Sequence, residues 1–457
     1  MGCACFLLAA LLGAASDSPR VFTLTARANV WDVETADLNG DGRTDILLLC
    51  SDEEASPLDK EIALFLADEA GGYPAAPSAS LPLPEMSGPV MLAECDGAPP
   101  KEAVVLDAYG AAVHAFRNGA FEKTGETRFP SLLPCGSREP VFLKKAAVDL
   151  LGDGRDVWLI PSPSGLLLQR LDGPVATVAC DVRSEIRRYE STHITHRLPA
   201  VHPFTLPGQT TKALAFLSDE YADFASGGGW KETHRFKVPM TLEEKWDANT
   251  AMEDISGNGL PDLVVTQVKG TVNMVAKTHV YLAEKPFTYP ETPAAEFTFK
   301  GGVSAPVLKD VDGDGRQDIV QISIPLGVTN FINYFVRGKI AIHSEVYLFN
   351  GTDFGKKPTF STNITMEAPE GRERVAYTFG DFTGDGRLDV AYGKSGDTLV
   401  VRAGEKEQFL ASKPCASVNI PSFGIAEPVS LNGNPAEDIL LFHPGGKNAK
   451  RVDVVLF

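Results

Sequence analysis

The sequence predicts an all-β fold built from repeated units, and three observations support this prediction. A loop rich in Asp, Asn and Gly recurs along the chain, and its best copy is Asp310–Asp318. Each good copy runs directly into a short apolar strand, as this one runs into Ile319–Ile322. The copies begin roughly 50–70 residues apart. A period of this size in strand-rich sequence is typical of a propeller or a solenoid.

The best loop has the composition of a calcium-binding loop. Carboxylates occupy its first, third, fifth and ninth positions: Asp310, Asp312, Asp314 and Asp318. Gly315, at the sixth position, permits the sharp turn that lets these oxygens converge. Arg316, at the seventh position, can offer its carbonyl. Hard oxygen ligands in this number suit Ca²⁺, which takes about six to eight of them.

Seven further copies follow the same spacing with different degrees of completeness. Three good copies keep four side-chain oxygens: Asp37–Asp45, Asp254–Asp262 and Asp381–Asp389. A fifth copy carries Asp149 and Asp153, lacks the third-position oxygen and is one residue short. Three weak copies, which begin at Glu94, Thr205 and Ser430, have lost several oxygens and are expected to keep only the turn.

Two simpler explanations of these loops are less consistent with the sequence. A single Asp/Gly cluster is usually only a turn, because these residues tolerate the left-handed region and cap their own backbone. Four good copies in register, each before an apolar strand, make accidental turns a poor explanation. An EF-hand would need flanking helices and a glutamate at the twelfth position. The twelfth residues here are Leu48, Val265, Gln321 and Tyr392.

The copies resemble the FG-GAP/VCBS repeats found in the β-propeller of integrin α subunits and in many bacterial secreted proteins. In that family the loop joins two strands of a blade and carries Ca²⁺ on the rim. The resemblance implies side-chain ligands at Asp37, Asn39, Asp41, Asp45, Asp254, Ser256, Asn258, Asp262, Asp310, Asp312, Asp314, Asp318, Asp381, Thr383, Asp385 and Asp389. It implies carbonyl ligands at Arg43, Leu260, Arg316 and Arg387. About four structural Ca²⁺ sites are therefore expected, with a degenerate fifth near Asp149 and Asp153.

With this resemblance, residues 20–457 are expected to form a single β-propeller of four-stranded blades. The first blade is predicted to contain the strands Val33–Ala36, Ile46–Leu49, Glu61–Leu66 and Ala79–Leu83. The last unit stops one strand short, and Val21–Thr25 is expected to fill that place and close the ring. Eight motif starts favour eight blades. Seven is the alternative, if the copy near Thr205 is a loop insertion.

The N-terminus predicts export. Residues 1–15 are uncharged, apolar and end in small residues, which is typical of a secretory signal peptide, although a basic n-region is missing. The run is too short to span a bilayer, and no other segment resembles a transmembrane helix. We therefore expect a secreted, periplasmic or cell-surface protein. Lipid attachment at Cys3 or Cys5 stays open, although the preceding residues do not form the usual lipoprotein box.

The net charge limits the classes of binding partner, and the cysteines limit the possible disulfides and metal sites. A formal net charge of −18 argues against nucleic acid and anionic membranes as partners. Five cysteines follow the signal segment, with no CxxC pair and no metal-ligand spacing: Cys50, Cys95, Cys135, Cys180 and Cys415. One or two disulfides among them are compatible with export, but the pairing cannot be deduced.

The expected function rests on the calcium-loop motifs and on the absence of familiar catalytic motifs. The sequence has no Gly-x-Ser-x-Gly, His-Glu-x-x-His or phosphate-binding glycine motif. We therefore expect a non-catalytic binding or adhesion module for an extracellular protein or glycan, in an oligomeric state left open. The alternative is a propeller-fold polysaccharide lyase or glycoside hydrolase, whose acid and base would be scattered across blades.

Two irregular stretches are candidates for specificity. Residues 181–204 are unusually rich in basic and His side chains, and a solvated loop or edge strand is favoured there over a metal or glycan site. The aromatic stretch Asn330–Phe335 is expected to pack as part of a strand pair rather than to form a sugar-binding or protein-binding surface.

Overall fold

The computed structural model describes residues 18–188, 192–239, 246–270, 274–303, 305–324, 334, 337–369 and 374–457. Within these residues every element with defined bounds is a β-strand, and the strands are numbered β1–β34. In this part of the chain no helix has the length and apolarity needed to cross a membrane. The expected signal peptide, residues 1–15, lies outside the described residues, as does nearly all of the stretch 330–335.

The first half of the chain folds into four-stranded antiparallel sheets, each made of consecutive strands. The first sheet contains β2 (Asn29–Ala36), β3 (Asp45–Asp52), β4 (Asp59–Phe65) and β5 (Ala79–Leu83). The second contains β6 (Val90–Ala93), β7 (Glu102–Asp107), β8 (Gly110–Arg117) and β9 (Ala120–Arg128). The third contains β10 (Ala147–Val148), β11 (Val157–Ser162), β12 (Gly165–Arg170) and β13 (Gly173–Val178). The fourth contains β16 (Ala200–Phe204), β17 (Ala213–Leu217), β18 (Tyr221–Ser226) and β19 (Glu232–Lys237).

Between the third and fourth sheets, the chain forms a separate two-stranded sheet of β14 (Arg183–Arg188) and β15 (Thr192–Arg197). The copy of the motif near Thr205 is therefore not a loop insertion, because it connects β16 to β17 within a complete four-stranded sheet.

The next two units share one eight-stranded sheet. One unit contains β20 (Trp246–Glu253), β21 (Asp262–Lys269), β22 (Met274–Tyr281) and β23 (Ala295–Val303). The other contains β24 (Val307–Lys309), β25 (Asp318–Ile324), β26 (Lys339–Tyr347) and β27 (Phe360–Glu367). They are joined where the end of β23 pairs with the end of β25, at Gly302↔Ile324 and Val303↔Ser323.

The last two sheets complete the order. One contains β28 (Tyr377–Gly380), β29 (Asp389–Ser395), β30 (Thr398–Arg402) and β31 (Ala416–Asn419). The other contains β32 (Ile425–Val429), β33 (Asp438–Phe442), β34 (Arg451–Leu456) and, as its fourth strand, β1 (Arg20–Thr25) from the start of the chain. β1 runs antiparallel to β34 over all six of its residues, from Arg20↔Leu456 to Thr25↔Arg451. The N-terminal strand thus fills the expected place.

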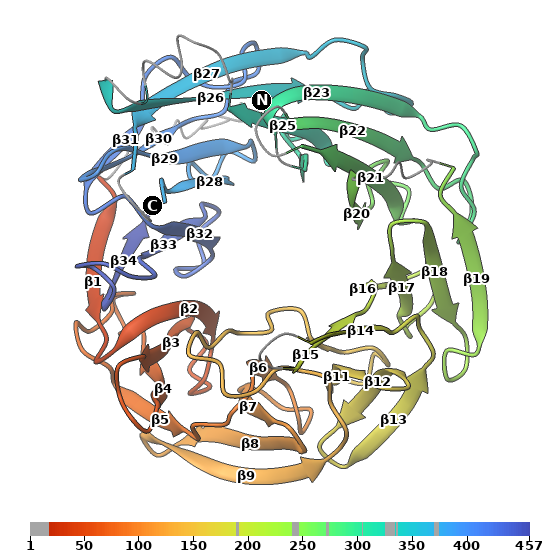
Figure 1. Ribbon diagram of the computed structural model, residues 1–457. Coiled ribbons are helices and arrows are strands. Elements are labelled where there is room, and N and C mark those ends of the chain that lie inside the picture. The colour runs from red at the N-terminus through yellow and green to blue at the C-terminus, as the bar shows by residue number, and fades with distance from the viewer. Residues whose placement is uncertain are drawn as a thin grey trace, which may run out of the picture.

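Figure 1 shows that these sheets stand around a common centre, as in a propeller. The first strand of a unit, such as β2, β20 or β28, lies toward the centre, and the fourth strand, such as β9, β13 or β19, lies at the outside. The predicted all-β, propeller-like architecture of four-stranded sheets is confirmed. Within the described residues the chain forms eight four-stranded units, one for each motif start.

The core lies between neighbouring sheets. Eight buried apolar clusters each combine side chains of one unit with side chains of the next, and the cluster between the last and the first unit completes the circuit. In β3, Ile46 and Leu48 face one neighbouring unit, whereas Leu47 and Leu49 face the other. Because successive side chains of a strand point to opposite faces, a strand buried on both faces needs an unbroken apolar run.

Candidate metal centre

The predicted calcium loops lie side by side along one rim of the ring. Each connects the first strand of a unit to its second, as residues 310–318 connect β24 to β25. In five pairs of neighbouring loops, the eighth residue donates its backbone N–H to a carbonyl at the first or second position of the preceding loop. These bonds are Asp156→Glu94 (2.7 Å), Lys212→Leu150 (2.8 Å), Gln317→Ile255 (3.2 Å), Leu388→Val311 (3.4 Å) and Glu437→Asp381 (2.7 Å).

One loop departs from this pattern for a covalent reason. The eighth residue of the loop that begins at Asp254 is Pro261, which has no N–H to donate. The loops nevertheless stay in contact there, since the position of a Cβ on Gly259 would lie 3.5 Å from Cγ of Pro207 in the preceding loop. At these six junctions, neighbouring loops are in contact along the rim, so the conformation of one loop affects the junction between two units. We refer to this row of loops as the loop belt.

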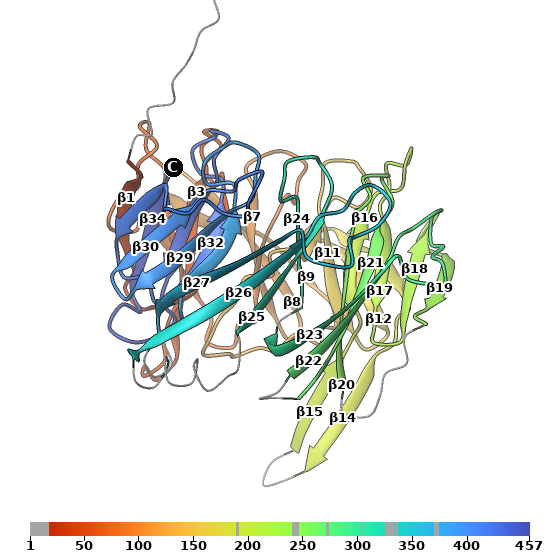
Figure 2. The same cartoon turned by 90° about the horizontal axis from the view of Figure 1, so that it is seen from above.

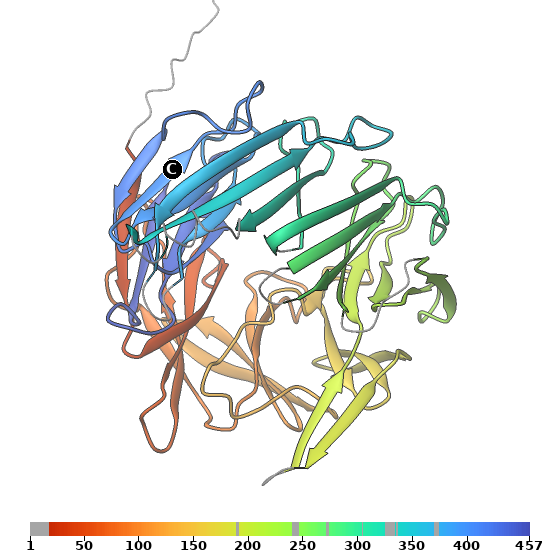
Figure 3. The same ribbon diagram turned by 45° about the horizontal axis from the view of Figure 1, so that its top comes forward.

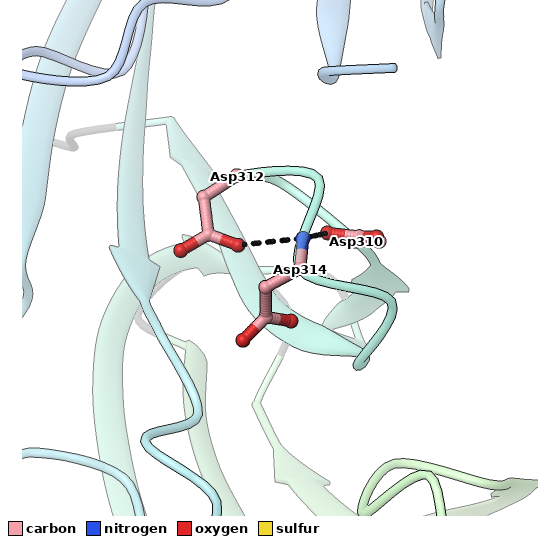
Figure 4. Close-up of side chains that lie close together, drawn as sticks. All are labelled: Asp310, Asp312 and Asp314. Atoms are coloured by element: carbon pink, nitrogen blue, oxygen red, sulfur yellow. Dashed lines mark hydrogen bonds between the residues drawn. The ribbon is translucent and has the colours of Figure 1, made fainter.

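The loop at Asp310 brings three carboxylates together (Figure 4). Asp310 accepts the backbone N–H groups of Gly313 (2.8 Å) and Asp314 (3.2 Å) through Oδ1, and that of Gly315 (2.8 Å) through Oδ2. Asp312 Oδ1 accepts the same Asp314 N–H at 3.2 Å. One carboxylate oxygen from each of Asp310, Asp312 and Asp314 lies within 4.8 Å of the other two. Among the described residues this is the one group of three or more Asp, Glu, His or Cys side chains at such distances.

The donor set of this loop fits a hard divalent cation. All three groups are carboxylates, the ligands that Ca²⁺ prefers. Burial and the charge of Asp314 raise the pKa of Asp312, and a bound cation would relieve that repulsion. One protein cation already lies at the edge of the group, because Arg316 Nη1 is 3.1 Å from Asp314 Oδ2. The predicted ligands Asp310, Asp312 and Asp314 are thus brought together.

The other good loops repeat the backbone geometry with fewer carboxylates. Their first-position aspartates accept N–H groups from the loop: Asp37 from Gly40 and Gly42, Asp254 from Asn258 and Gly259, and Asp381 from Asp385 and Gly386. In the first and last of these loops the seventh-position arginine forms an ion pair with the fifth-position aspartate, Arg43 with Asp41 and Arg387 with Asp385. Asn39 Nδ2 donates to Asp41, and Asn258 Nδ2 donates to the carbonyl of Ala283.

The ninth-position aspartates have a different environment from the first three ligands. Asp318 is buried, and its two oxygens accept the N–H groups of Val311 (2.9 Å) and Phe349 (2.8 Å). It does not belong to the group of three carboxylates within 4.8 Å. The same arrangement, one N–H from the loop and one from the segment after the third strand, recurs at Asp45, Asp262, Asp389 and Asp438. These carboxylates tie the loop to the neighbouring turn of the same unit.

Burial is the main influence on the acidity of these groups. It raises the pKa of Asp318 to about 7 and the pKa values of Asp389 and Asp438 to about 6, against the opposing effect of the donated N–H groups. Burial likewise raises the pKa values of Asp45 and Asp262. The sequence motif gave no sign of this burial, because a ligand and a buried clamp both require a carboxylate at the ninth position.

The incomplete loop at Asp149 contains a cation from the protein itself. Arg170, at the end of β12, is 7% exposed and donates to both oxygens of Asp153 at 2.6 and 2.9 Å. Its Nη2 also donates to the carbonyl of Arg155 at 2.8 Å. Asp153 and Arg155 are the fifth and seventh residues of this loop, the positions that supply a carboxylate and a carbonyl in the predicted calcium loops. Spacing alone could not predict this partner, because Arg170 lies outside the motif.

A second charged cluster lies on the inner strands, away from the loop belt. Lys144 Nζ is 3.3 Å from Asp32 Oδ1 on β2 and forms an ion pair with Glu427 on β32. The neighbouring Glu34 has a raised pKa, chiefly because of burial. The chain segment before β10 thus bridges the first and last units. Sequence motifs did not reveal this cluster, since its members are distant in the chain; Lys144 and Glu427, for example, are 283 residues apart.

The five cysteines do not form disulfides in this structure. Cys50, Cys95, Cys135, Cys180 and Cys415 are all free thiols. Cys50 is fully buried on β3, as expected for a small apolar residue at the end of a strand.

Comparisons with known proteins give no family. No protein-family model matches the chain, and no curated protein matches its sequence. Similar solved structures include two of BBS1N in complex with ARL6DN, soaked with lead (TM-score 0.40, 9% identity) and with mercury (TM-score 0.38, 10% identity). In each of these the match covers 95% of this chain and 95% of the other. Another is the V. cholerae biofilm matrix protein Bap1, with a TM-score of 0.33 and 11% identity over 94% of this chain and 88% of that one. These TM-scores, all below 0.5, support no statement about function.

Proposed function

We propose that this chain is an exported, calcium-stabilised β-propeller of eight blades, with FG-GAP/VCBS-type loops, that acts as a non-catalytic binding module for an extracellular protein or glycan. The observation that carries the calcium assignment is the group of Asp310, Asp312 and Asp314, whose oxygens lie within 4.8 Å of one another. The pairing of β1 with β34 and the circuit of eight apolar clusters support the closed, eight-bladed arrangement.

Calcium is proposed to stabilise the blade junctions. In this role Asp310, Asp312 and Asp314 would hold the ion, with the Arg316 carbonyl as a further ligand, and the ion would offset the repulsion between the carboxylates. The fixed loop would then support its neighbour, because Val311 accepts the N–H of Leu388 in the next loop. At a free Ca²⁺ concentration of 100 times Kd, each independent site would add about 2.7 kcal/mol of stability.

Thermal unfolding with and without a chelator tests this assignment. For the mature parent chain we expect a lower Tm in EGTA than in Ca²⁺. In Asp312→Ala/Asp314→Ala, we expect a lower Tm in Ca²⁺ and a smaller change on chelation. Glu122→Ala/Glu291→Ala removes two exposed carboxylates that are not part of the predicted calcium loops and should behave as the parent. Equal melting of the loop variant and the parent, with and without chelator, would show that the loop is only a turn.

A catalytic function is the second candidate, favoured by the cluster of Lys144, Asp32 and Glu427. An ammonium between carboxylates on the inner strands is the kind of acid and base pairing that a lyase or glycoside hydrolase requires. The mutual neutralisation of these charges equally explains the cluster as a bridge between the first and last units. A polysaccharide panel read by ultraviolet absorbance and reducing ends separates the two roles. Product release that disappears in Lys144→Met and Glu427→Gln would establish an enzyme, whereas binding without product release would support the binding module.

A further inference from the structure

One element stands apart from the ring. Among the described residues, the β14–β15 arm, residues 183–188 and 192–197, forms a two-stranded sheet of its own, with six matched residue pairs from Arg183↔Arg197 to Arg188↔Thr192. Figure 2 and Figure 3 show that it projects beyond the ring of sheets. All six residues of β14 are exposed, unlike those of the strands within the ring.

One face of the arm is apolar at its centre. Ile186 and Ile194 are directly paired across the two strands, so both side chains point to the same face. They are 61% and 57% exposed, respectively. Next to them on this face, Ser184 and His196 form a hydrogen bond of 2.9 Å. The two paired isoleucines form a small apolar patch on a projecting hairpin, with more than half of each residue exposed, and this patch would gain from cover by a protein partner.

The opposite face is basic. Arg183 and Arg197 are directly paired, and Arg187 lies two residues along the same strand from Glu185, to which it is bonded at 3.1 Å. Arg183 also forms an ion pair with Asp181 at 2.7 Å. Arg183, Arg187 and Arg197 lie on this face with Glu185, whereas Arg188 lies two residues from Ile186 on the isoleucine face. Over both faces, the described strands of the arm contain four arginines and one acidic residue, whereas the whole chain has a net charge of −18. The arm therefore has a net positive charge, opposite in sign to that of the whole chain, and attracts an acidic partner.

The backbone edges of the arm are suited to the addition of a further strand. Among the strands that the structure describes, neither β14 nor β15 has a second neighbour, so each has one edge whose N–H and C=O groups are not part of a sheet. An extended peptide that pairs with such an edge places alternate side chains on opposite faces. On this arm, one set would meet the Ile186/Ile194 pair, and the other would meet the arginine face.

We propose that the β14–β15 arm is the partner-binding element and that it takes an extended, acidic protein segment with alternating apolar and acidic residues, added as a third strand. This inference rests on the proposed function as a binding module and names its partner class. The apolar face favours a protein over an anionic polysaccharide, because a polysaccharide would engage the arginines and leave both isoleucines in water. The partner strand satisfies the open edge, covers the isoleucines and neutralises the arginines in one contact.

A set of labelled peptides tests this assignment on the full mature chain in Ca²⁺. The probe is a fluorescein-labelled octapeptide of alternating Val and Glu, measured by fluorescence anisotropy. Three matched peptides separate its features: Ser/Glu removes the apolar side chains, Val/Lys reverses the charge, and a Val/Glu peptide N-methylated at alternate residues blocks one row of backbone hydrogen bonds.

The variants Ile186→Ser/Ile194→Ser and Arg187→Glu/Arg197→Glu test the two faces. The control Arg117→Glu/Arg128→Glu makes the same charge change on exposed residues of the second sheet. Near-ultraviolet circular dichroism and Tm establish that each variant is folded. We expect saturable binding of the Val/Glu peptide to the parent and the control. We expect at least tenfold weaker binding of the three matched peptides, and at least tenfold weaker binding of the Val/Glu peptide to both arm variants.

Several results would overturn the assignment. Absence of saturable binding, equal binding of the Ser/Glu or N-methylated peptide, or unchanged binding to either arm variant would exclude strand addition on the arm. Self-association in sedimentation experiments that is lost in both arm variants would assign the arm to a second copy of this chain instead. If a glycan or protein binds the parent and the arm variants equally, the binding module stands and the arm is not its site. Product release from a polysaccharide would contradict the proposed function separately.

Discussion

The guanidinium of Arg170 holds the carboxylate of Asp153 through two hydrogen bonds, 2.6 and 2.9 Å long. It also donates to the carbonyl of Arg155 at 2.8 Å. In the loop at Asp310, the equivalent fifth and seventh positions are a proposed ligand carboxylate and a proposed ligand carbonyl. In the third unit, the side chain of Arg170 therefore provides the positive charge for the corresponding loop. This charge is present at every concentration of Ca²⁺.

Replacement of this cation should destabilise the chain whether or not Ca²⁺ is present. Arg170→Gln removes the bidentate contact, and we expect a loss of about 2 kcal/mol, the usual contribution of a hydrogen bond to a charged group. Arg170→Lys should recover only part of the loss, because an ammonium cannot reproduce the planar fork. Urea unfolding in Ca²⁺ and in EGTA measures both effects. A loss that appears only in Ca²⁺ would contradict the role of Arg170 as the resident cation.

Two glycines allow the contribution of the contact between neighbouring loops to stability to be measured separately from the backbone strain within one loop. Gly313 and Gly315 both have positive φ angles, 79° and 85°. A Cβ on Gly313 would lie 3.0 Å from the carbonyl oxygen of Gly386 in the next loop, whereas a Cβ on Gly315 would meet nothing within 4 Å. Gly315→Ala should cost about 1 kcal/mol from the left-handed backbone alone, and Gly313→Ala should cost more.

The comparison of these two alanine variants by urea unfolding isolates the junction between the loops. Both variants keep all of the proposed side-chain ligands of their loop. Equal losses of stability in the two variants would mean that the belt of loops does not support the contact between units.

Asp438, the buried ninth-position aspartate of the last loop, should make the free energy of unfolding depend on pH. Burial raises the pKa of Asp438 to about 6 in the folded chain, compared with 3.8 for an unperturbed aspartate. A group with a raised folded pKa contributes its stability fully below the unfolded value, near pH 4, and loses it as the pH rises through about 6. A shift of roughly two pH units corresponds to about 3 kcal/mol.

The variant Asp438→Asn removes this titration. It should also be less stable at low pH, because one amide oxygen cannot accept the bonds that Asp438 accepts from Leu431 and Phe457. Urea unfolding from pH 4 to pH 7 should show that the difference in stability between parent and variant shrinks as pH rises. Parallel pH profiles for the two chains would exclude Asp438 as the titrating group.

Closure by the N-terminal strand should contribute directly to stability. Leu24 on β1 is fully buried in the cluster shared by the last and the first units. Leu24→Ala should cost about 3 kcal/mol, since it removes apolar burial and leaves a cavity. Val21→Ala is a control on the same strand, because Val21 is 39% exposed. If urea unfolding gives similar losses for the two variants, β1 does not hold the ring closed.

Local patterns allowed most of the repeated architecture to be predicted. The strand expected at Ile46–Leu49 lies within β3, and the strand expected at Val21–Thr25 lies within β1. Both follow from unbroken or alternating apolar runs next to a turn. The convergence of Asp310, Asp312 and Asp314 could also be predicted from the sequence, because the turn is local and its N–H groups donate to the carboxylate of its own first residue, Asp310.

The remaining features of the candidate sites depend on contacts between residues that are far apart in the chain. Asp318 links its loop to the next turn because the N–H of Phe349 donates to it. Asp153 forms its ion pair with Arg170 because β12 lies beside the loop. Lys144 meets Glu427 because the segment before β10 reaches the junction between the first and last units. The amino-acid sequence determined the strands, the turns and their period, which are local properties. Only the tertiary structure decided which partner each carboxylate received and which hairpin was left outside the ring, because those outcomes depend on which distant surfaces pack together.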